Sequence, residues 1–324
     1  MSEHGAQEPT SAHKLFDRAS GKLLESQEPA GGLLNRLYGS AAGRFFLNAF
    51  LARPATSAVV GRALRTRASK RLIAPFVERN GIDLTGFAPL ESYKSYEDFF
   101  ERERLEPTPT SHAEHELVAA ADSRLFAFAF DDWRLARVNA KGTTYPLASL
   151  VLLPAKGHAR SAQAVATSSM TRLPKAGTVL VFSLSLSDCH HFACPFAASW
   201  KATYCIDGEL HSVREVAQGE RPYSRNKRWV DLLELSSTHE LAAMIAIGAL
   251  LVGEIRHIPF VDRMTLAAGD ELGCFELGGS TIVLVVPQSV HVDEDILFHS
   301  HNGVETLVRA GDIIGSITAQ ETRG

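Results

Sequence analysis

Near its centre the chain carries the stretch Gly177-Thr-Val-Leu-Val-Phe-Ser-Leu184, in which β-branched and large apolar residues follow a glycine. Two similar runs come later, Thr281-Ile-Val-Leu-Val-Val286 and Asp312-Ile-Ile-Gly315. Short runs of this kind, bounded by turn residues, are typical of β-strands. Because no helical pattern alternates with them after residue 115, we expect an antiparallel β domain and not a βαβ sheet.

A helical pattern precedes this β-rich part of the chain. Apolar residues recur at helical spacing over residues 33–80, and Pro54 and Gly61 interrupt them. The pattern predicts at least two helices, the second ending near Gly81. A further short, aromatic and charged helix is expected within residues 92–102.

The predicted fold class is therefore α+β, with a helical N-terminal region followed by a β-rich antiparallel body. We expect a flexible polar tail at residues 1–32, a helical, basic and amphipathic region at 33–110, and the β-rich catalytic domain at 111–324.

Basic residues are concentrated in the helical region, although the net charge of the whole chain is -4. Residues 33–79 contain nine arginines and lysines but only one acidic residue, Glu78. Amphipathic helices of this composition suit the surface of an anionic bilayer. They would equally suit packing on the body with a solvated basic face. The sequence leaves both interpretations open, and they do not exclude each other.

Composition excludes several classes of protein. With 324 residues, 45% hydrophobic and 22% charged, the chain can bury a large core and is neither a disordered polymer nor a polytopic membrane protein. We find no spanning apolar run and no signal peptide, and expect a protein of the cytosol or of the cytosolic face of a membrane. The four cysteines form no C-x-x-C pair, and the net charge argues against nucleic-acid binding.

The first candidate site is Ser280, which directly follows Gly278 and Gly279. Paired glycines permit backbone angles closed to other residues, so Ser280 could occupy a strained turn, although an ordinary hairpin explains the same residues. A serine placed in this way could attack the carbonyl of Gly279 and convert the peptide bond to an ester. β-Elimination would then cut the chain and leave a pyruvoyl group in place of Ser280.

Candidate partners for such a serine occur in two other segments. Asp188-Cys-His190-His191 follows a predicted strand and could provide metal ligands, a general base or a hydrogen-bonded loop; the spacing of a third metal ligand is missing. Asp122 is a lone carboxylate after small apolar residues, a turn residue or a catalytic one. Together these segments supply the Asp, His and Ser that activate a serine nucleophile.

At this point the chain resembles the phosphatidylserine decarboxylase family over residues 33 to 315. Several separate motifs carry the resemblance in the right order. They lie at residues 93–102, 121–125, 141–147, 188–190, 248–253 and 271–281.

The resemblance implies a role for each matching residue. Ser280 would become the pyruvoyl prosthetic group by cleavage after Gly279, which leaves a β chain of residues 1–279 and an α chain of residues 280–324. His190 would activate Ser280, and Asp122 would orient and charge-stabilise His190. Secondary or substrate-binding positions would be His191, Lys141 and Tyr145, and no metal is implied.

The implied activity is the conversion of phosphatidylserine to phosphatidylethanolamine and CO2, through a Schiff base between the pyruvoyl ketone and the substrate amine. A proton must then reach the carbanion, from His190 or His191. The implied partners are phosphatidylserine and an anionic membrane surface, with a possible homodimer, and the implied location is peripheral, on the cytoplasmic face of the cell membrane. Two alternatives stay open: a decarboxylase of a free amino acid such as tryptophan, and a lipid-binding protein that never matures.

The histidine motif departs from the family pattern Asp-Tyr-His-Arg-x-His-x-Pro. Residues 188–195 place His191 where the family has arginine and Ala193 where it has its second histidine. The simplest account is that His190 serves both self-processing and turnover. A bolder account is a changed substrate or an inactive protein.

Overall fold

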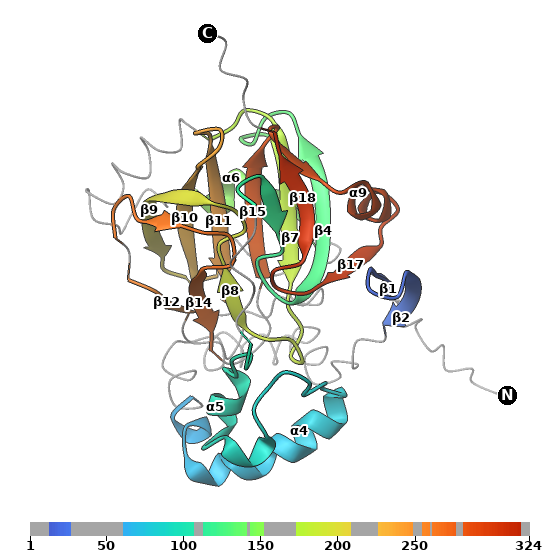
Figure 1. The fold of residues 1–324 in the computed structure, drawn as a ribbon, viewed down its shortest axis with the longest axis vertical. Coiled ribbons are helices and arrows are strands. Elements are labelled where there is room, and N and C mark those ends of the chain that lie inside the picture. Colours follow the sequence, from blue (N-terminus) through green and yellow to red (C-terminus); the bar gives the residue numbers. More distant parts are fainter. Residues whose placement is uncertain are drawn as a thin grey trace, which may run out of the picture.

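The computed structural model describes residues 13–26, 61–106, 113–140, 143–151, 173–208, 226–248, 255–259, 261–276 and 281–318. More of these residues lie in strands than in helices (Figure 1).

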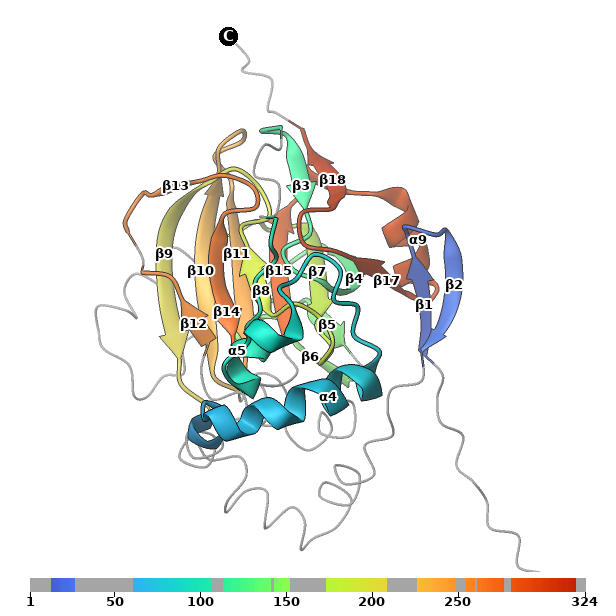
Figure 2. The same cartoon turned by 60° about the horizontal axis from the view of Figure 1, so that its bottom comes forward.

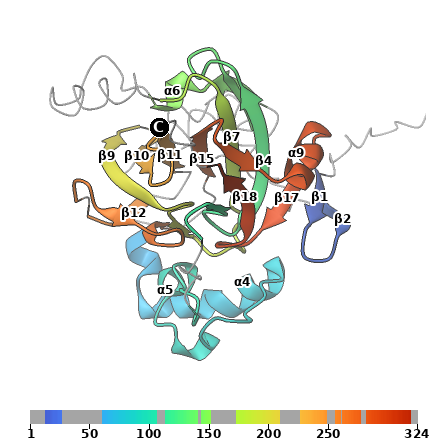
Figure 3. The same ribbon diagram turned by 45° about the horizontal axis from the view of Figure 1, so that its top comes forward.

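A ten-stranded sheet forms the body of the protein. Every pair in it is antiparallel except β1 with β17, which is parallel. Figure 3 shows this sheet curving from β9 to β17, with α4 and α5 at one end. In spatial order its strands are β13 (Thr265–Leu266), β9 (Ala198–Ile206), β10 (Arg228–Leu235), β11 (Leu241–Ile247), β15 (Thr281–Pro287), β7 (Gly177–Ser183), β4 (Ser123–Phe130), β17 (Glu305–Val308), β1 (His13–Asp17) and β2 (Lys22–Ser26).

Smaller sheets and two helices complete the body. The sheets are β12 (Ile255–His257) with β14 (Glu271–Phe275) and β8 (His191–Ala193), β16 (Val290–Val292) with β18 (Ile313–Ile317) and β3 (Glu116–Val118), and the pair β5 (Arg137–Ala140) and β6 (Thr143–Pro146). The helices are α6 (Ala148–Val151) and α9 (Glu294–His301).

The core is centred on the middle strands of the long sheet. All seven residues of β11 and all seven of β15 are buried. β15 is rich in branched apolar side chains, which pack well on a pleated surface covered on both faces, whereas β11 combines leucine and isoleucine with three alanines and a methionine. The predicted strands at 177–184, 281–286 and 312–315 are therefore confirmed, with boundaries shifted by at most two residues.

Helical elements gather at one end of the sheet, where α4 and α5 lie beside the ends of β8 and β14 (Figures 1 and 2). The described elements are a helical turn at 61–64, the 3-10 helices η2 (Arg67–Leu72) and η3 (Leu90–Ser92), and the α-helices α4 (Ile73–Asn80) and α5 (Tyr96–Phe100). They share a small core of their own, made of Ile73, Ile82, Tyr93 and Phe99.

Helix α4 ends where the sequence predicted, because its C-cap Gly81 adopts a left-handed φ of 59° that favours glycine. The expected short helix within 92–102 corresponds to η3 and α5, and Ser95 caps α5 by accepting a hydrogen bond from the Asp98 amide. The helices expected over 33–60 lie outside the described residues. Among the helices that the structure describes, none is long and apolar enough to cross a membrane.

One expectation about the fold is wrong. The segment 1–32, predicted as a flexible tail, contains the hairpin β1–β2, and Leu15 is buried against the sheet. Arg18 anchors the hairpin through ion pairs with Asp293 and Asp295 at the N-terminal end of α9.

Candidate active site

The register of the central strands brings distant segments together at one edge of the sheet. Ser183 at the end of β7 lies opposite Thr281 at the start of β15 and opposite Arg124 near the start of β4. Thr281 also lies opposite Ile247, the last residue of β11. We call this place, where β7 and β11 end and β4 and β15 begin, the site edge.

The predicted site segments border the site edge. Asp122 directly precedes β4, the loop at residues 184–190 follows β7, and Thr281 is the residue next to Ser280 in the chain. Ser280, Gly279 and Lys141 themselves lie outside the described residues, and only the backbone of Tyr145, in β6, is described.

His190 is fully buried, with 0% of its surface exposed. Its Nδ1 lies 2.9 Å from the backbone oxygen of Asp188. A carbonyl oxygen can only accept, so Nδ1 carries the proton and Nε2 keeps a free lone pair. Burial, and next the positive charge of Arg102, lower the pKa of His190 to about 3. The ring is thus a neutral base at physiological pH, and its buried Nε2 has no hydrogen-bond partner among the described residues.

Aromatic and backbone groups hold this imidazole in place. The ring of Phe100, the last residue of α5, lies 4.1 Å from it between centroids. The amide of Phe275 in β14 donates to the backbone oxygen of His190 at 3.0 Å. In the same loop, the Asp188 carboxylate accepts a hydrogen bond from the Ser185 amide at 2.6 Å, while burial raises the pKa of this carboxyl to about 6.

His191, in contrast, is a cation. Its Nδ1 donates to the Glu271 carboxylate at 3.0 Å and its Nε2 to the backbone oxygen of Glu101 at 3.1 Å. Both partners are acceptors, so both nitrogens must carry protons. Burial opposes the charge, but hydrogen bonds to Cys274 and Glu271 outweigh it and raise the pKa of His191 to about 11. This residue is therefore unsuited to act as a base.

Asp122 does not contact His190. One of its carboxylate oxygens accepts a hydrogen bond from Nη2 of Arg104 at 2.6 Å, and the other accepts one from the Ala310 amide at 2.9 Å. Asp122 therefore does not accept a hydrogen bond from His190, as an orienting residue would; the His190 Nδ1–H donates instead to the Asp188 carbonyl. Arg104, which was not among the residues predicted from the sequence, forms an ion pair with the negatively charged Asp122 carboxylate.

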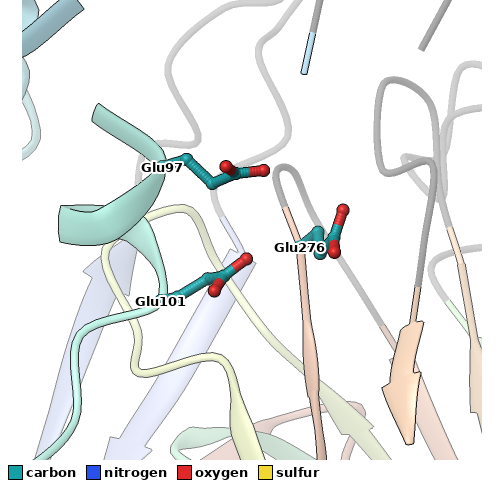
Figure 4. Close-up of side chains that lie close together, drawn as sticks. All are labelled: Glu97, Glu101 and Glu276. Atoms are coloured by element: carbon teal, nitrogen blue, oxygen red, sulfur yellow. The ribbon is translucent and has the colours of Figure 1, made fainter. Parts of the chain in front are cut away.

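Three glutamates gather where α5 meets the end of β14 (Figure 4). The carboxylates of Glu97, Glu101 and Glu276 have oxygens within 4.8 Å of one another. Arg65 forms ion pairs with Glu97 at 2.6 Å and with Glu276 at 3.0 Å, and Arg256 forms one with Glu101 at 3.0 Å. Two arginines therefore supply the positive charge that a cation would bring, and the cluster joins the helical region to β14.

Comparison with known proteins identifies the family. Residues 96–316, about two thirds of the chain, match the family described as phosphatidylserine decarboxylase. The phosphatidylserine decarboxylase proenzyme 2 of Clostridium acetobutylicum is 30% identical over 304 residues, covering 93% of this chain and 97% of the relative. The chain belongs to the phosphatidylserine decarboxylase family.

Other relatives in this family match over a similar length. The proenzyme of Ruminiclostridium cellulolyticum is 30% identical over 318 residues, covering 96% of this chain and 99% of the relative. The proenzyme of Chlamydia trachomatis serovar L2 is 29% identical over 306 residues, covering 92% and 95%.

The structure gives a physical account of one departure from the phosphatidylserine decarboxylase motif. His191 occupies the position of the motif's arginine and, with protons on both nitrogens, carries the same positive charge. Ala193, at the position of the motif's second histidine, is buried in β8, where its amide donates to the backbone oxygen of Ala120 at 2.9 Å. Among the described residues of this motif, only His190 has a free ring nitrogen.

Proposed function

We propose that the chain is a proenzyme that cuts itself between Gly279 and Ser280 and then decarboxylates phosphatidylserine to phosphatidylethanolamine. Its family membership supports the activity, which is that of a carboxy-lyase. The observation that carries the proposal is His190, whose neutral ring has an unpartnered Nε2. His190 ends the loop that follows β7, and the last residue of β7, Ser183, lies opposite Thr281, the residue after Ser280.

In the proposed self-cleavage His190 acts as the general base. Its Nε2 takes the proton of the Ser280 hydroxyl, and the oxygen attacks the carbonyl carbon of Gly279. The peptide C–N bond breaks, the amine gains a proton, and an ester results. Loss of the Ser280 α-proton then expels the Gly279 carboxylate and leaves a dehydroalanine. Water hydrolyses this group, which releases ammonia and leaves a pyruvoyl terminus.

The site edge fits a carbonyl-bearing group of this kind. Two buried polar atoms in segments that border this edge, His190 Nε2 and Thr281 Oγ1, have no hydrogen-bond partner among the described residues, and the threonine hydroxyl can donate to an oxygen. The pyruvoyl group supplies an electron-accepting carbonyl for the electron pair left when CO2 departs.

The other candidate residues take supporting roles in this proposal. His191 contributes a fixed positive charge, and Asp122 ties Arg104 and the segment at Ala310 to the site edge. Lys141 and Tyr145 stay candidates for substrate contacts.

The mass of the purified, denatured protein tests the self-cleavage. We expect two chains that separate between residues 279 and 280, the smaller one with a pyruvoyl terminus, and a single full-length chain for Ser280→Ala. Ser316→Ala, an exposed position in the same C-terminal piece, is the matched control and should be cleaved. A cleaved Ser280→Ala protein would contradict the assignment of Ser280 as the precursor of the pyruvoyl group.

The substrate is tested on the cleaved protein. Decarboxylation of phosphatidylserine in vesicles, with no CO2 released from free tryptophan or serine, is the expected result. Release of CO2 from a free amino acid alone would favour the alternative decarboxylase.

We further propose that the basic helical region meets an anionic membrane surface. Arg62 and Arg67 are exposed, whereas Arg65 is engaged by Glu97 and Glu276. Because each basic residue near such a surface contributes about 1 kcal/mol, the double variant Arg62→Glu with Arg67→Glu should weaken binding to phosphatidylserine-containing vesicles at least about tenfold. Vesicle co-sedimentation measures this effect.

A charge-matched control separates this surface from general electrostatics. Lys14 and Lys22 are exposed on the β1–β2 hairpin, and reversing both should leave vesicle binding within about twofold of wild type. Equal losses in the two double variants would indicate that net charge, and not the helical region, governs binding.

A further inference from the structure

Arg102 is a buried arginine whose contacts are unusual for a cation. It is 2% exposed, and its guanidinium binds backbone oxygens: Nη2 donates to Ser187 at 2.5 Å and to Asp188 at 3.2 Å, and Nη1 to Phe99 at 3.5 Å. No ion pair between Arg102 and a carboxylate occurs among the described residues, and burial lowers the pKa of Arg102. Burying a cation without a carboxylate partner costs free energy of folding, so the buried position of Arg102 reduces the stability of the protein.

The carbonyl that Arg102 binds is the one that fixes the His190 ring. The Asp188 oxygen accepts from Arg102 at 3.2 Å and from Nδ1 of His190 at 2.9 Å. A further hydrogen bond joins the same two segments: the Cys189 thiol donates to the backbone oxygen of Arg102 at 3.5 Å. The ring centroids of Phe87 and Phe99 lie 5.0 and 4.9 Å from Cζ of the guanidinium.

We propose that Arg102 is a positioning residue for His190. By holding the carbonyl oxygens of Ser187 and Asp188, its guanidinium keeps the loop in the shape that directs Nδ1–H to Asp188 and leaves Nε2 free as the base. This inference rests on the proposed function, since it assumes that His190 is the base for self-cleavage.

The positive charge of Arg102, like its hydrogen bonds, favours the neutral form of His190 that can act as a base. The titratable and charged groups around the imidazole are Arg102 from the segment after α5, Asp188 and Cys189 from the loop, and His191 from β8. The cations Arg102 and His191 oppose protonation of the ring. Without Arg102 one of the causes that lower the pKa of His190 is removed, so the ring should take up a proton at a higher pH than in the wild type, and the protonated ring cannot accept the Ser280 proton.

The rate of self-cleavage after cell-free synthesis of the full chain tests the inference. We expect the wild-type rate to be flat between about pH 5 and 8, because the ring stays neutral there. Arg102→Met should cleave about 100-fold more slowly at neutral pH, as expected for a misplaced general base, and more slowly still in acid. Added methylguanidinium, which can fill the vacated space, should restore part of the rate.

Two further variants keep the test decisive. Arg102→Lys retains the charge but cannot reach both carbonyls in the same way, so it should cleave about tenfold more slowly with a flat pH profile. It also decides the question if Arg102→Met does not fold. Arg18→Met removes an arginine that likewise donates to a backbone oxygen, that of Ile313, and should cleave at the wild-type rate without a response to methylguanidinium.

The outcomes separate this inference from the proposed function. A wild-type rate in Arg102→Lys and in folded Arg102→Met overturns it, as does a slowed Arg102→Met that shows neither the acid loss nor the rescue. If His190→Ala still cleaves, the assignment of the base fails, and with it the premise of this inference. If His190→Ala is uncleaved while the Arg102 variants cleave normally, the positioning role alone is wrong.

Discussion

Replacing His190 with alanine should leave the protein as one uncleaved chain. The substitution removes the buried, unpartnered Nε2, and among the described residues of the motif no other ring nitrogen is free to replace it. A general base of this kind contributes roughly 100- to 10,000-fold to a rate, so the time course should slow by at least about 100-fold. Gel electrophoresis of pulse-labelled protein over several hours measures this.

His191 provides the matched comparison in the same motif. His191→Ala removes a cation held by Glu271 and the Glu101 carbonyl, but leaves the bond between His190 and Asp188 in place, so cleavage should continue. His191→Arg keeps the positive charge and should cleave like wild type. The reverse pattern, with His190→Ala cleaved and His191→Ala intact, would move the base to His191.

A large loss of stability is expected when a buried ion pair between β10 and β12 is broken. Asp231 is 0% exposed; one of its oxygens lies 2.9 Å from Nε2 of His257, and the other accepts from the Trp200 indole at 3.0 Å. Nδ1 of His257 donates to the backbone oxygen of Ile258 at 2.9 Å. The imidazole therefore carries two protons and a positive charge, and its ring stacks on Trp229 with centroids 4.7 Å apart.

Asp231→Ala would leave the His257 charge buried without its partner. Breaking a buried pair in this way costs about 3–5 kcal/mol, whereas a partly exposed pair contributes about 0–1 kcal/mol. Lys201→Ala, which removes the pair between Lys201 and Glu234 at 2.9 Å on the neighbouring strands, is the control. Urea unfolding of uncleaved Ser280→Ala protein compares the two. Similar losses for both variants would contradict the assignment.

The same pair gives the stability a pH dependence of known sign. Hydrogen bonding to Asp231 outweighs burial and raises the pKa of His257 above its usual value. The stabilisation is therefore fully present below the unfolded pKa of about 6.5 and is lost as the pH rises through the folded pKa. His257→Gln should flatten this part of the profile of unfolding free energy against pH. An unchanged slope in that variant would show that other groups cause it.

Local patterns predicted the strands and the helix end but not the pairing that completes the sheet. The β-branched runs at β7 and β15 and the glycine after α4 are signals within a few residues of their effect. The β1–β2 hairpin has a weak local signal, because Leu15 and its neighbours are stabilised by pairing with β17, almost 300 residues away, at Glu305. Sequence alone cannot reveal such a partner.

In the candidate site, too, some features have a local sequence signal and others depend on residues distant in the chain. The family resemblance assigned the base to His190 and a secondary position to His191, but the residues alone could not explain this, because the base and the cation differ only in which acceptors surround each ring. It also gave no reason to pair Asp122 with Arg104, or to bury Arg102 behind the loop. The roles of Ser280, Lys141 and Tyr145 stay predictions.

The place of β15 in the long sheet has a consequence for the mature enzyme. A cut between residues 279 and 280 would make Thr281 the second residue of the smaller chain, yet β15 lies between β7 and β11 with all seven residues buried. The two fragments would then share one hydrophobic interior and could separate only by global unfolding. β15, which begins one residue after the new terminus, would keep both of its neighbouring strands, so the reactive end would be created next to a strand that was fixed in the sheet before the bond was broken.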